Sequence, residues 1–198
     1  MHRLLRHISW IGMAVVVTLC VSGCATFHLT QGPFQPKGKK LAVIAGLTNP
    51  SSLQAAQALA DEVGKASQFQ VMPPPHIAQA IPNYPQLIKG PYTSAYFEID
   101  EDYDKTDVGR VKEIQKQLGT EYLYVLWAPA SVQSGGKGLF FKNYPVMHIV
   151  AQVFEFPGGK EIGRGKYMIR VDDDHNDLMR DDLARVAKEF AEKTHMPK

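Results

Sequence analysis

One continuous apolar run decides the fold of this chain: Lys40-Leu41-Ala42-Val43-Ile44-Ala45-Gly46-Leu47-Thr48, which the turn signal Asn49-Pro50 closes. Such a run is typical of a central strand that is covered on both faces. Ser51 and Gln54 then form a capping-box pattern, and the apolar residues that follow recur at helical spacing. Residues 68–72 have the pattern of a second strand. A strand, a helix and a strand in immediate succession predict a crossover and a parallel pair.

The rest of the chain adds strands and helices to this start. After a run of prolines, residues 76–81 have the pattern of a short helix, and Asp107 and Gly119 mark the N-cap and the stop of a longer one. A strand pattern follows over residues 121–128, and an apolar stripe from Met179 predicts a C-terminal helix. With a further hairpin, we predict an α/β (α+β) domain with a mixed sheet of about five strands, in the order β-α-β-α-α-β-β-β-α.

The hairpin signal Pro157-Gly158-Gly159 separates two strand patterns, over residues 145–156 and 161–171. A three-residue loop places one apolar set on one face of both strands: Met147, Ile149, Ala151, Val153, Gly163, Gly165, Tyr167 and Ile169. The opposite face then carries the polar set His148, Gln152, Arg164, Lys166 and Arg170. A slip of one residue would mix the arginines with the apolar set, so we predict this register.

The N-terminal segment has the parts of a bacterial lipoprotein signal. Arg3 and Arg6 form a positive n-region, an apolar h-region covers residues 8–19, and Val21-Ser22-Gly23-Cys24 resembles a lipobox. The small residues give a signal peptidase access to the backbone, and the Cys24 thiol is the group that is lipidated. The alternatives are a generic secretory signal with an incidental thiol, or a short N-terminal membrane helix.

This interpretation divides the chain into a signal peptide (residues 1–23), a lipidated tether (24–39) and one periplasmic α/β domain (40–198). The tether is predicted because residues 25–39 are polar, rich in Gly and Pro, and without periodicity. Fully extended, it would reach about 50 Å. Because Ala25 stands where Asp favours inner-membrane retention, we expect a lipid anchor in the outer membrane that faces the periplasm.

The composition narrows the class of partner. The chain has 22 basic and 20 acidic side chains, and the two signal arginines account for the difference. The mature chain is therefore neutral and has no electrostatic reason to bind nucleic acid. Of the two cysteines, Cys20 leaves with the signal and Cys24 is acylated. No thiol remains for a disulfide, so packing must stabilise the domain.

A long segment over residues 82–106 has no periodicity and is rich in aromatic residues. Loops of this length are uncommon and are often functional. One interpretation is that the aromatic side chains staple the loop onto the domain. The other is a partner-binding lid that uses Tyr92, Tyr96 and Phe97.

Some polar clusters resemble ligand sites. Asp100, Asp102 and Asp104 alternate as calcium ligands do, but Lys105 and Val111 stand where an EF-hand needs Gly and Glu. We therefore expect a solvated acidic loop.

Two other clusters also have plainer interpretations. The run Asp172-Asp173-Asp174-His175-Asn176-Asp177 could hold a metal, but it lies where Asp and Asn commonly cap a helix. Ser134-Gly135-Gly136-Lys137-Gly138 lacks the P-loop spacing and is predicted to be a hairpin turn. Phe140 and Phe141, which follow it, could anchor in the core or touch lipid or a partner. We predict no metal site and no cofactor.

The order of elements and three short motifs resemble a known periplasmic domain. The motifs are Leu47-Thr48-Asn49, Gln70-Val71-Met72-Pro73, and Val111-Lys112-Glu113-Ile114 leading to Leu118-Gly119-Thr120-Glu121-Tyr122-Leu123. Over residues 39–195 the chain resembles the lipoprotein α/β domain that is similar to the N-terminal domain of TolB and occurs in CsgG and LpoB. The connection over residues 133–143 is too short for the membrane hairpins of the CsgG channel, and the predicted tether is short for an LpoB-like activator.

The resemblance implies a non-enzymatic adaptor or assembly factor that binds another envelope protein or polymer. The residues offer two candidate partner-binding surfaces: the aromatic loop at Tyr92, Tyr96 and Phe97, and the basic sheet face at Arg164, Lys166 and Arg170. The plainer interpretation of the second is a solvated sheet face, and the other is a surface for an anionic envelope ligand. The alternative is an envelope hydrolase or metal-dependent enzyme that uses His148, His175 and nearby acids, assembled in space.

Overall fold

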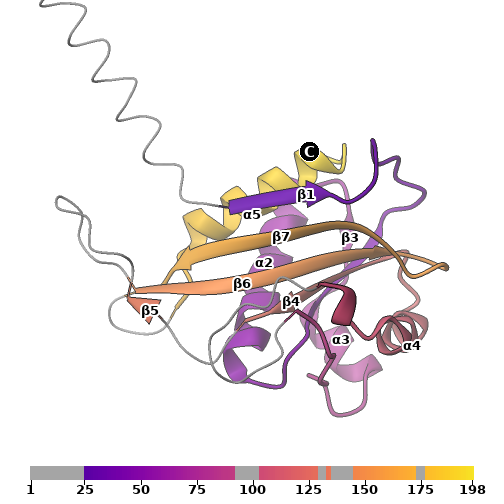
Figure 1. Ribbon diagram of the computed structural model, residues 1–198, viewed down its shortest axis with the longest axis horizontal. Coiled ribbons are helices and arrows are strands. Elements are labelled where there is room, and N and C mark those ends of the chain that lie inside the picture. Colours follow the sequence, from indigo (N-terminus) through magenta and orange to yellow (C-terminus); the bar gives the residue numbers. More distant parts are fainter. Residues whose placement is uncertain (1–24, 92–102, 129–132, 135–144, 173–176) are drawn as a thin grey trace, which may run out of the picture.

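The computed structural model describes residues 25–91, 103–128, 133–134, 145–172 and 177–198. These ranges form one mixed sheet of seven strands with four helices (Figure 1). The strands are β1 (Ala25–Leu29), β2 (Lys40–Ala45), β3 (Gln70–Val71), β4 (Tyr122–Trp127), β5 (Gln133–Ser134), β6 (Pro145–Glu155) and β7 (Lys160–Arg170). The helices are α2 (Pro50–Ala66), α3 (Pro74–Ala80), α4 (Val108–Leu118) and α5 (Arg180–Lys193), with a 3₁₀ turn at Tyr103–Lys105.

The strands lie in the order β1-β7-β6-β4-β2-β3, and β5 pairs with β6 beside this path. β2 is parallel to β3, as the strand-helix-strand start predicts. It is also parallel to β4, and the other pairs are antiparallel. The predicted α/β class, the five predicted strands and their order with the helices are confirmed, and β1 and β5 are additional. In the described ranges, none of the helices is both long and apolar enough to cross a bilayer.

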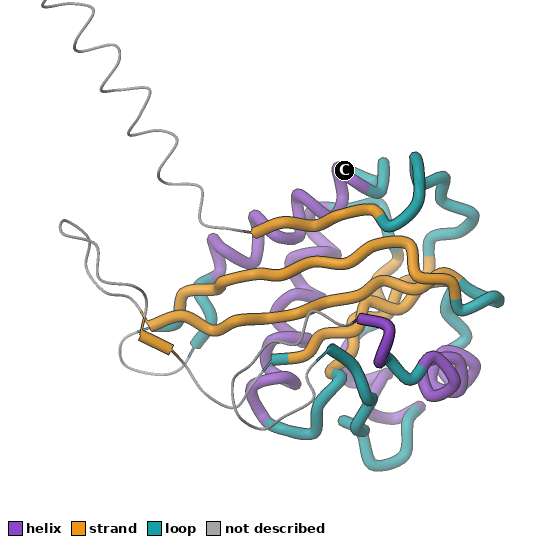
Figure 2. The backbone as a smooth tube through the Cα atoms, viewed as in Figure 1, coloured by secondary structure: helices purple, strands orange, loops and turns teal. Residues whose placement is uncertain are grey.

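Helices cover the two faces of the sheet unequally (Figures 1 and 2). α2 and α5 pack on one face, over a core that extends from β2 to β1. α3 and α4 pack on the other face, over β2, β4 and the Phe154 end of β6. The central run behaves as predicted, since Leu41–Ala45 are all buried between the two helical layers.

The helix caps agree with the sequence in one helix and differ in another. In α4, the Asp107 side chain accepts a hydrogen bond from the Arg110 N–H at 3.0 Å, and Gly119 ends the helix at φ 62°, as predicted. In α2, the predicted cap at Ser51 is wrong. Asn49 caps this helix, accepting from the Ser52 N–H at 2.7 Å, because Pro50 has the φ that a first helical residue needs.

The hairpin register is confirmed over most of its length. Met147 pairs with Ile169, and Val153 pairs with Gly163, which places the apolar and polar sets on the predicted faces. The predicted three-residue loop is wrong: the turn covers residues 156–159. A bulge between Val153 and Phe154 shifts the pairing of the residues next to the turn. From Val146 to Val153 the strands keep the predicted register.

The predicted tether is wrong for the residues that the structure describes. Ala25–Leu29 form an edge strand of the sheet, and Phe34 is buried against Tyr122 with ring centroids 5.7 Å apart. The Lys37 N–H also donates to the Tyr122 hydroxyl at 2.8 Å. Residues 25–37 therefore contribute to the folded domain, which was predicted to begin at residue 40.

Candidate functional site

The first candidate feature is the start of β1, directly after the predicted lipidation site. Cys24 lies outside the described residues, and Ala25, the next residue, is the first residue of β1. β1 pairs antiparallel with β7, from Ala25 opposite Tyr167 to Leu29 opposite Gly163. The position that would carry the lipid therefore adjoins the sheet edge without an intervening loop.

Phe27 fastens β1 to the domain. Its side chain is 1% exposed, and its ring lies 5.5 Å from the Phe190 ring in an edge-to-face arrangement. The ring occupies space that Gly163 leaves open, since a Cβ atom at Gly163 would lie 2.2 Å from the Phe27 Cζ. Gly163 on β7 thus forms a socket for Phe27, an arrangement in which an aromatic ring covers a strand glycine.

Hydrogen bonds complete the attachment of β1. The Phe27 N–H donates to the Glu189 Oε1 on α5 at 2.8 Å, which satisfies a backbone group on the outer edge of the strand. At the far end of β1, the Thr30 N–H donates to the Ile162 carbonyl at 3.1 Å, and its hydroxyl donates to the Glu161 carbonyl at 2.9 Å. The whole of β1 is thus held by β7 and α5.

The predicted basic face lies where the register places it. Arg164, Lys166 and Arg170 alternate along β7 on the side away from the predicted apolar set. Arg164 forms an ion pair with Glu161 (Nε to Oε1, 2.6 Å). The guanidinium of Arg164 also lies over the Tyr103 ring, 4.4 Å from its centroid. This cation is therefore engaged within the domain.

Arg170 is also engaged, by Asp182 of α5. The guanidinium contacts both carboxylate oxygens, at 2.9 and 3.0 Å, and the Arg170 N–H donates to the same carboxylate at 2.9 Å. Burial raises the pKa of Asp182, but the hydrogen bonds and charge of Arg170, with the charge of Arg185, outweigh it, so the pKa lies below its ordinary value. The ion pair joins the end of β7 to the first turn of α5.

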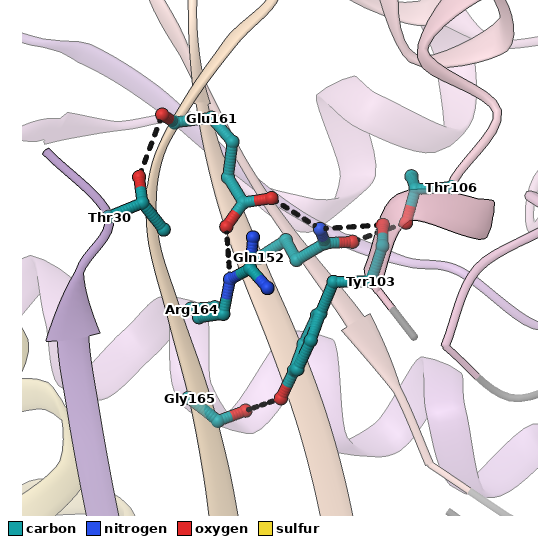
Figure 3. Close-up of polar contacts among 7 residues, drawn as sticks. All are labelled: Thr30, Tyr103, Thr106, Gln152, Glu161, Arg164 and Gly165. Carbon is teal, nitrogen blue, oxygen red and sulfur yellow. Dashed lines mark hydrogen bonds and ion pairs between the residues drawn. The ribbon is translucent and has the colours of Figure 1, made fainter. Parts of the chain in front are cut away.

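A buried polar cluster occupies the same sheet face (Figure 3). Gln152 on β6 is 1% exposed, and its amide donates to the Glu161 carboxylate at 2.7 Å and to the Tyr103 carbonyl at 3.3 Å. Its carbonyl oxygen accepts from the Thr106 hydroxyl. Glu161 therefore joins Gln152 to Arg164, and the cluster fixes residues 103–106 to the sheet.

The aromatic loop can be assessed only at its two ends. Tyr92, Tyr96 and Phe97 lie outside the described residues. Tyr84 accepts a hydrogen bond from the Ala45 N–H at 2.8 Å, and Tyr103 is buried under Arg164. Tyr84 and Tyr103 therefore attach the ends of the loop to the domain, as the first interpretation predicts. The lid interpretation stays a prediction for the residues between them.

Of the two histidines of the alternative function, the structure describes only His148. His148 is half-buried on β6 opposite Met168, and burial lowers its pKa. His175 lies outside the described residues. Among the residues that the structure does describe, no group of three or more His, Cys, Asp or Glu side chains is placed to hold a metal.

The structure also tests parts of two loop predictions, one for residues 172–177 and one for the segment that begins at Gln133. The predicted capping role of the 172–177 run is wrong at α5, whose N-cap is Met179 without a side-chain hydrogen bond. The described ends of this run close on each other instead, since the Asp172 N–H donates to the Asp177 carbonyl at 2.8 Å. Gln133–Ser134 pair antiparallel with β6, as a hairpin requires, while Phe140 and Phe141 lie outside the described residues.

Comparisons with known proteins give distant structural likeness only. No family model matches the chain, and no curated protein matches it. It is similar to the solved PelC dodecamer from Paraburkholderia phytofirmans, with a TM-score of 0.48 and 11% identity over 85% of this chain and 98% of that chain. It is also similar to the lipoprotein GNA1162 from Neisseria meningitidis, with a TM-score of 0.39 and 12% identity over 70% and 85% of the two chains. The resemblance to TolB, CsgG and LpoB stays a prediction.

Proposed function

We propose that this protein is a lipoprotein, acylated on Cys24 and anchored in the outer membrane, that acts as a non-enzymatic adaptor or assembly factor in the periplasm. The observation that carries the proposal is the position of the predicted cleavage site relative to β1. The lipobox predicts a mature N-terminus at residue 24, and β1, the first strand that the structure describes, begins at Ala25. Cleavage before Cys24 would remove no residue of β1.

The anchor is tested by metabolic labelling with an alkyne fatty acid in a bacterial host, followed by membrane fractionation. We expect label on the wild-type chain and recovery in the outer membrane. Cys24→Ala removes the acceptor thiol, so this variant should carry no label and keep residues 1–23. Ser22→Ala, which keeps a small side chain before the cysteine, is the matched control and should be processed normally. An unlabelled wild-type chain would refute the lipoprotein assignment.

For the partner, a protein is a better fit than an anionic polymer. Two of the three cations on the predicted basic face, Arg164 and Arg170, are paired with carboxylates of the same chain. An anionic polymer would have to compete with those carboxylates. A protein partner could instead use the aromatic residues Tyr92, Tyr96 and Phe97 as anchors, since buried aromatic side chains dominate many protein interfaces.

The adaptor role is tested by crosslinking in intact cells and mass spectrometry of the captured proteins. We expect one dominant envelope protein with the wild-type chain and its loss when Tyr92, Tyr96 and Phe97 are together replaced by Ala. Replacement of Leu87, the exposed apolar residue of the preceding segment, by Ala is the matched control. Binding that survives the triple replacement would refute the aromatic loop as the docking surface.

A further inference from the structure

The attachment of β1 restricts how the domain can sit on a membrane. β1 is joined to β7 through five residue pairs, and Phe27 is buried between the sheet and α5. Glu189 and Thr30 add hydrogen bonds at the outer edge and at the far end of the strand. A lipid on Cys24 would therefore be attached to a fixed strand rather than to a flexible segment.

The geometry points to a domain that is held directly at the bilayer, with the end of the sheet at which β1 begins turned toward the lipid headgroups. This inference rests on the proposed function, because it requires the lipid on Cys24. The Cα atoms of Cys24 and Ala25 are about 3.8 Å apart across one peptide bond. Buried acyl chains hold the modified residue at the membrane surface, so the strand start can lie only a few ångströms from it.

The same end of the sheet contains the start of β6, the end of β7 and the start of α5, as Figure 1 shows. The β6–β7 turn, with Gly158, lies at the opposite end. An eleven-residue strand such as β6 measures about 36 Å. Among the described residues near the anchored end, Thr26, Asp177 and Arg180 are exposed and polar, which suits contact with lipid headgroups.

The test uses single cysteines in the mature lipidated protein. Cys20 leaves with the signal and Cys24 is acylated, so an introduced cysteine is the only free thiol. Arg180→Cys labels the anchored end of the domain and Gly158→Cys labels the opposite end. Gly158 is suitable because a Cβ atom there meets no other atom within 4 Å. A fluorophore on each is measured in phosphatidylcholine and phosphatidylglycerol vesicles that contain a headgroup-attached quencher.

We expect the label at position 180 to be quenched at least three-fold more strongly than the label at position 158. Insertion of a fifteen-residue Gly-Ser spacer between Cys24 and Ala25 should remove this difference, because a flexible spacer of that length lets the domain move away from the surface. The same spacer added after Lys198 is the matched control and should leave the difference intact.

The outcomes separate the two proposals. Equal quenching at both positions in vesicle-bound protein of native length would overturn the orientation and leave lipidation intact. A protein that carries no lipid by mass spectrometry and does not associate with vesicles would overturn the proposed function itself. Phe27→Ala offers a second check: it releases β1 without altering the lipobox, so it should reduce the quenching at position 180 in the same direction as the spacer.

Discussion

The two faces of β7 are held by different kinds of contact. Toward α2 and α5, Gly163 leaves room for the Phe27 ring, and Tyr167 packs in the core, where its hydroxyl lies 2.7 Å from the Tyr124 hydroxyl. On the other face, Arg164 is held by the Glu161 carboxylate, and at the end of β7 Arg170 is held by Asp182 of α5. The contacts toward α2 and α5 depend on how side-chain volumes fit together, so their contribution to stability should be insensitive to pH. The carboxylate contacts depend on charge and on hydrogen-bond geometry, and they should weaken when the carboxylates are protonated.

The largest expected effect comes from emptying the socket on the apolar face. Phe27→Ala should lower the free energy of unfolding by about 3–5 kcal/mol, because it removes a buried ring and leaves a cavity. Urea denaturation of the mature chain carrying Cys24→Ser measures this loss. Thr26→Ala, an exposed neighbour on the same strand, should cost less than about 0.5 kcal/mol. A similar loss in both variants would mean that the socket does not hold β1.

A smaller effect is expected from filling the socket. Gly163→Ala places a methyl group against the Phe27 ring, and such overpacking costs about 1–3 kcal/mol. In a Phe27→Ala background the same methyl group enters empty space, so its cost should disappear. A double-mutant cycle measures this coupling. Additive effects of the two substitutions would contradict direct contact between these positions.

Among the charged contacts, Asp182→Asn at the end of β7 should cost about 1–2 kcal/mol near pH 7, because it weakens charged hydrogen bonds to a partly exposed arginine. The pKa of Asp182 is lowered in the folded state. Its contribution is therefore complete above the unfolded pKa of about 4 and is lost as the pH falls through the lower folded value.

The stability difference between wild type and Asp182→Asn should accordingly shrink between pH 5 and pH 2. Urea denaturation across this range measures it, and Asp181→Asn, which alters the preceding, exposed acid of α5, is the control. A difference that stays constant with pH would contradict the charge-based account of the Arg170–Asp182 contact.

The smallest effect is expected at Tyr103. Its hydroxyl lies 3.5 Å from the Gly165 carbonyl, a long contact, so Tyr103→Phe should change the unfolding free energy by less than about 0.5 kcal/mol. Tyr103→Leu also removes the ring under Arg164 and should cost about 0.5–1 kcal/mol more. Thermal denaturation of both variants distinguishes the ring from the hydroxyl, and equal losses would assign the contact to the hydroxyl.

The candidate surfaces were predictable from the sequence to different extents. Alternation in β6 and β7 placed Arg164, Lys166 and Arg170 on one face correctly, because a slip of one residue would bury cations. Their partners were not predictable: Asp182 is twelve residues from Arg170 and reaches it only through the packing of α5 on the sheet. Gln152 was placed on the correct face, but its contacts with residues 103–106 depend on how a distant segment returns to the sheet.

The sequence by itself determined the order of most of the elements, the parallel start and the hairpin register, because these depend on local spacing and on alternation. Only the tertiary structure decided that residues 25–29 are a strand. Five residues with one large aromatic side chain carry too weak a pattern to form a strand alone, and their stability comes from a socket at Gly163 and a carboxylate at Glu189, both more than a hundred residues away.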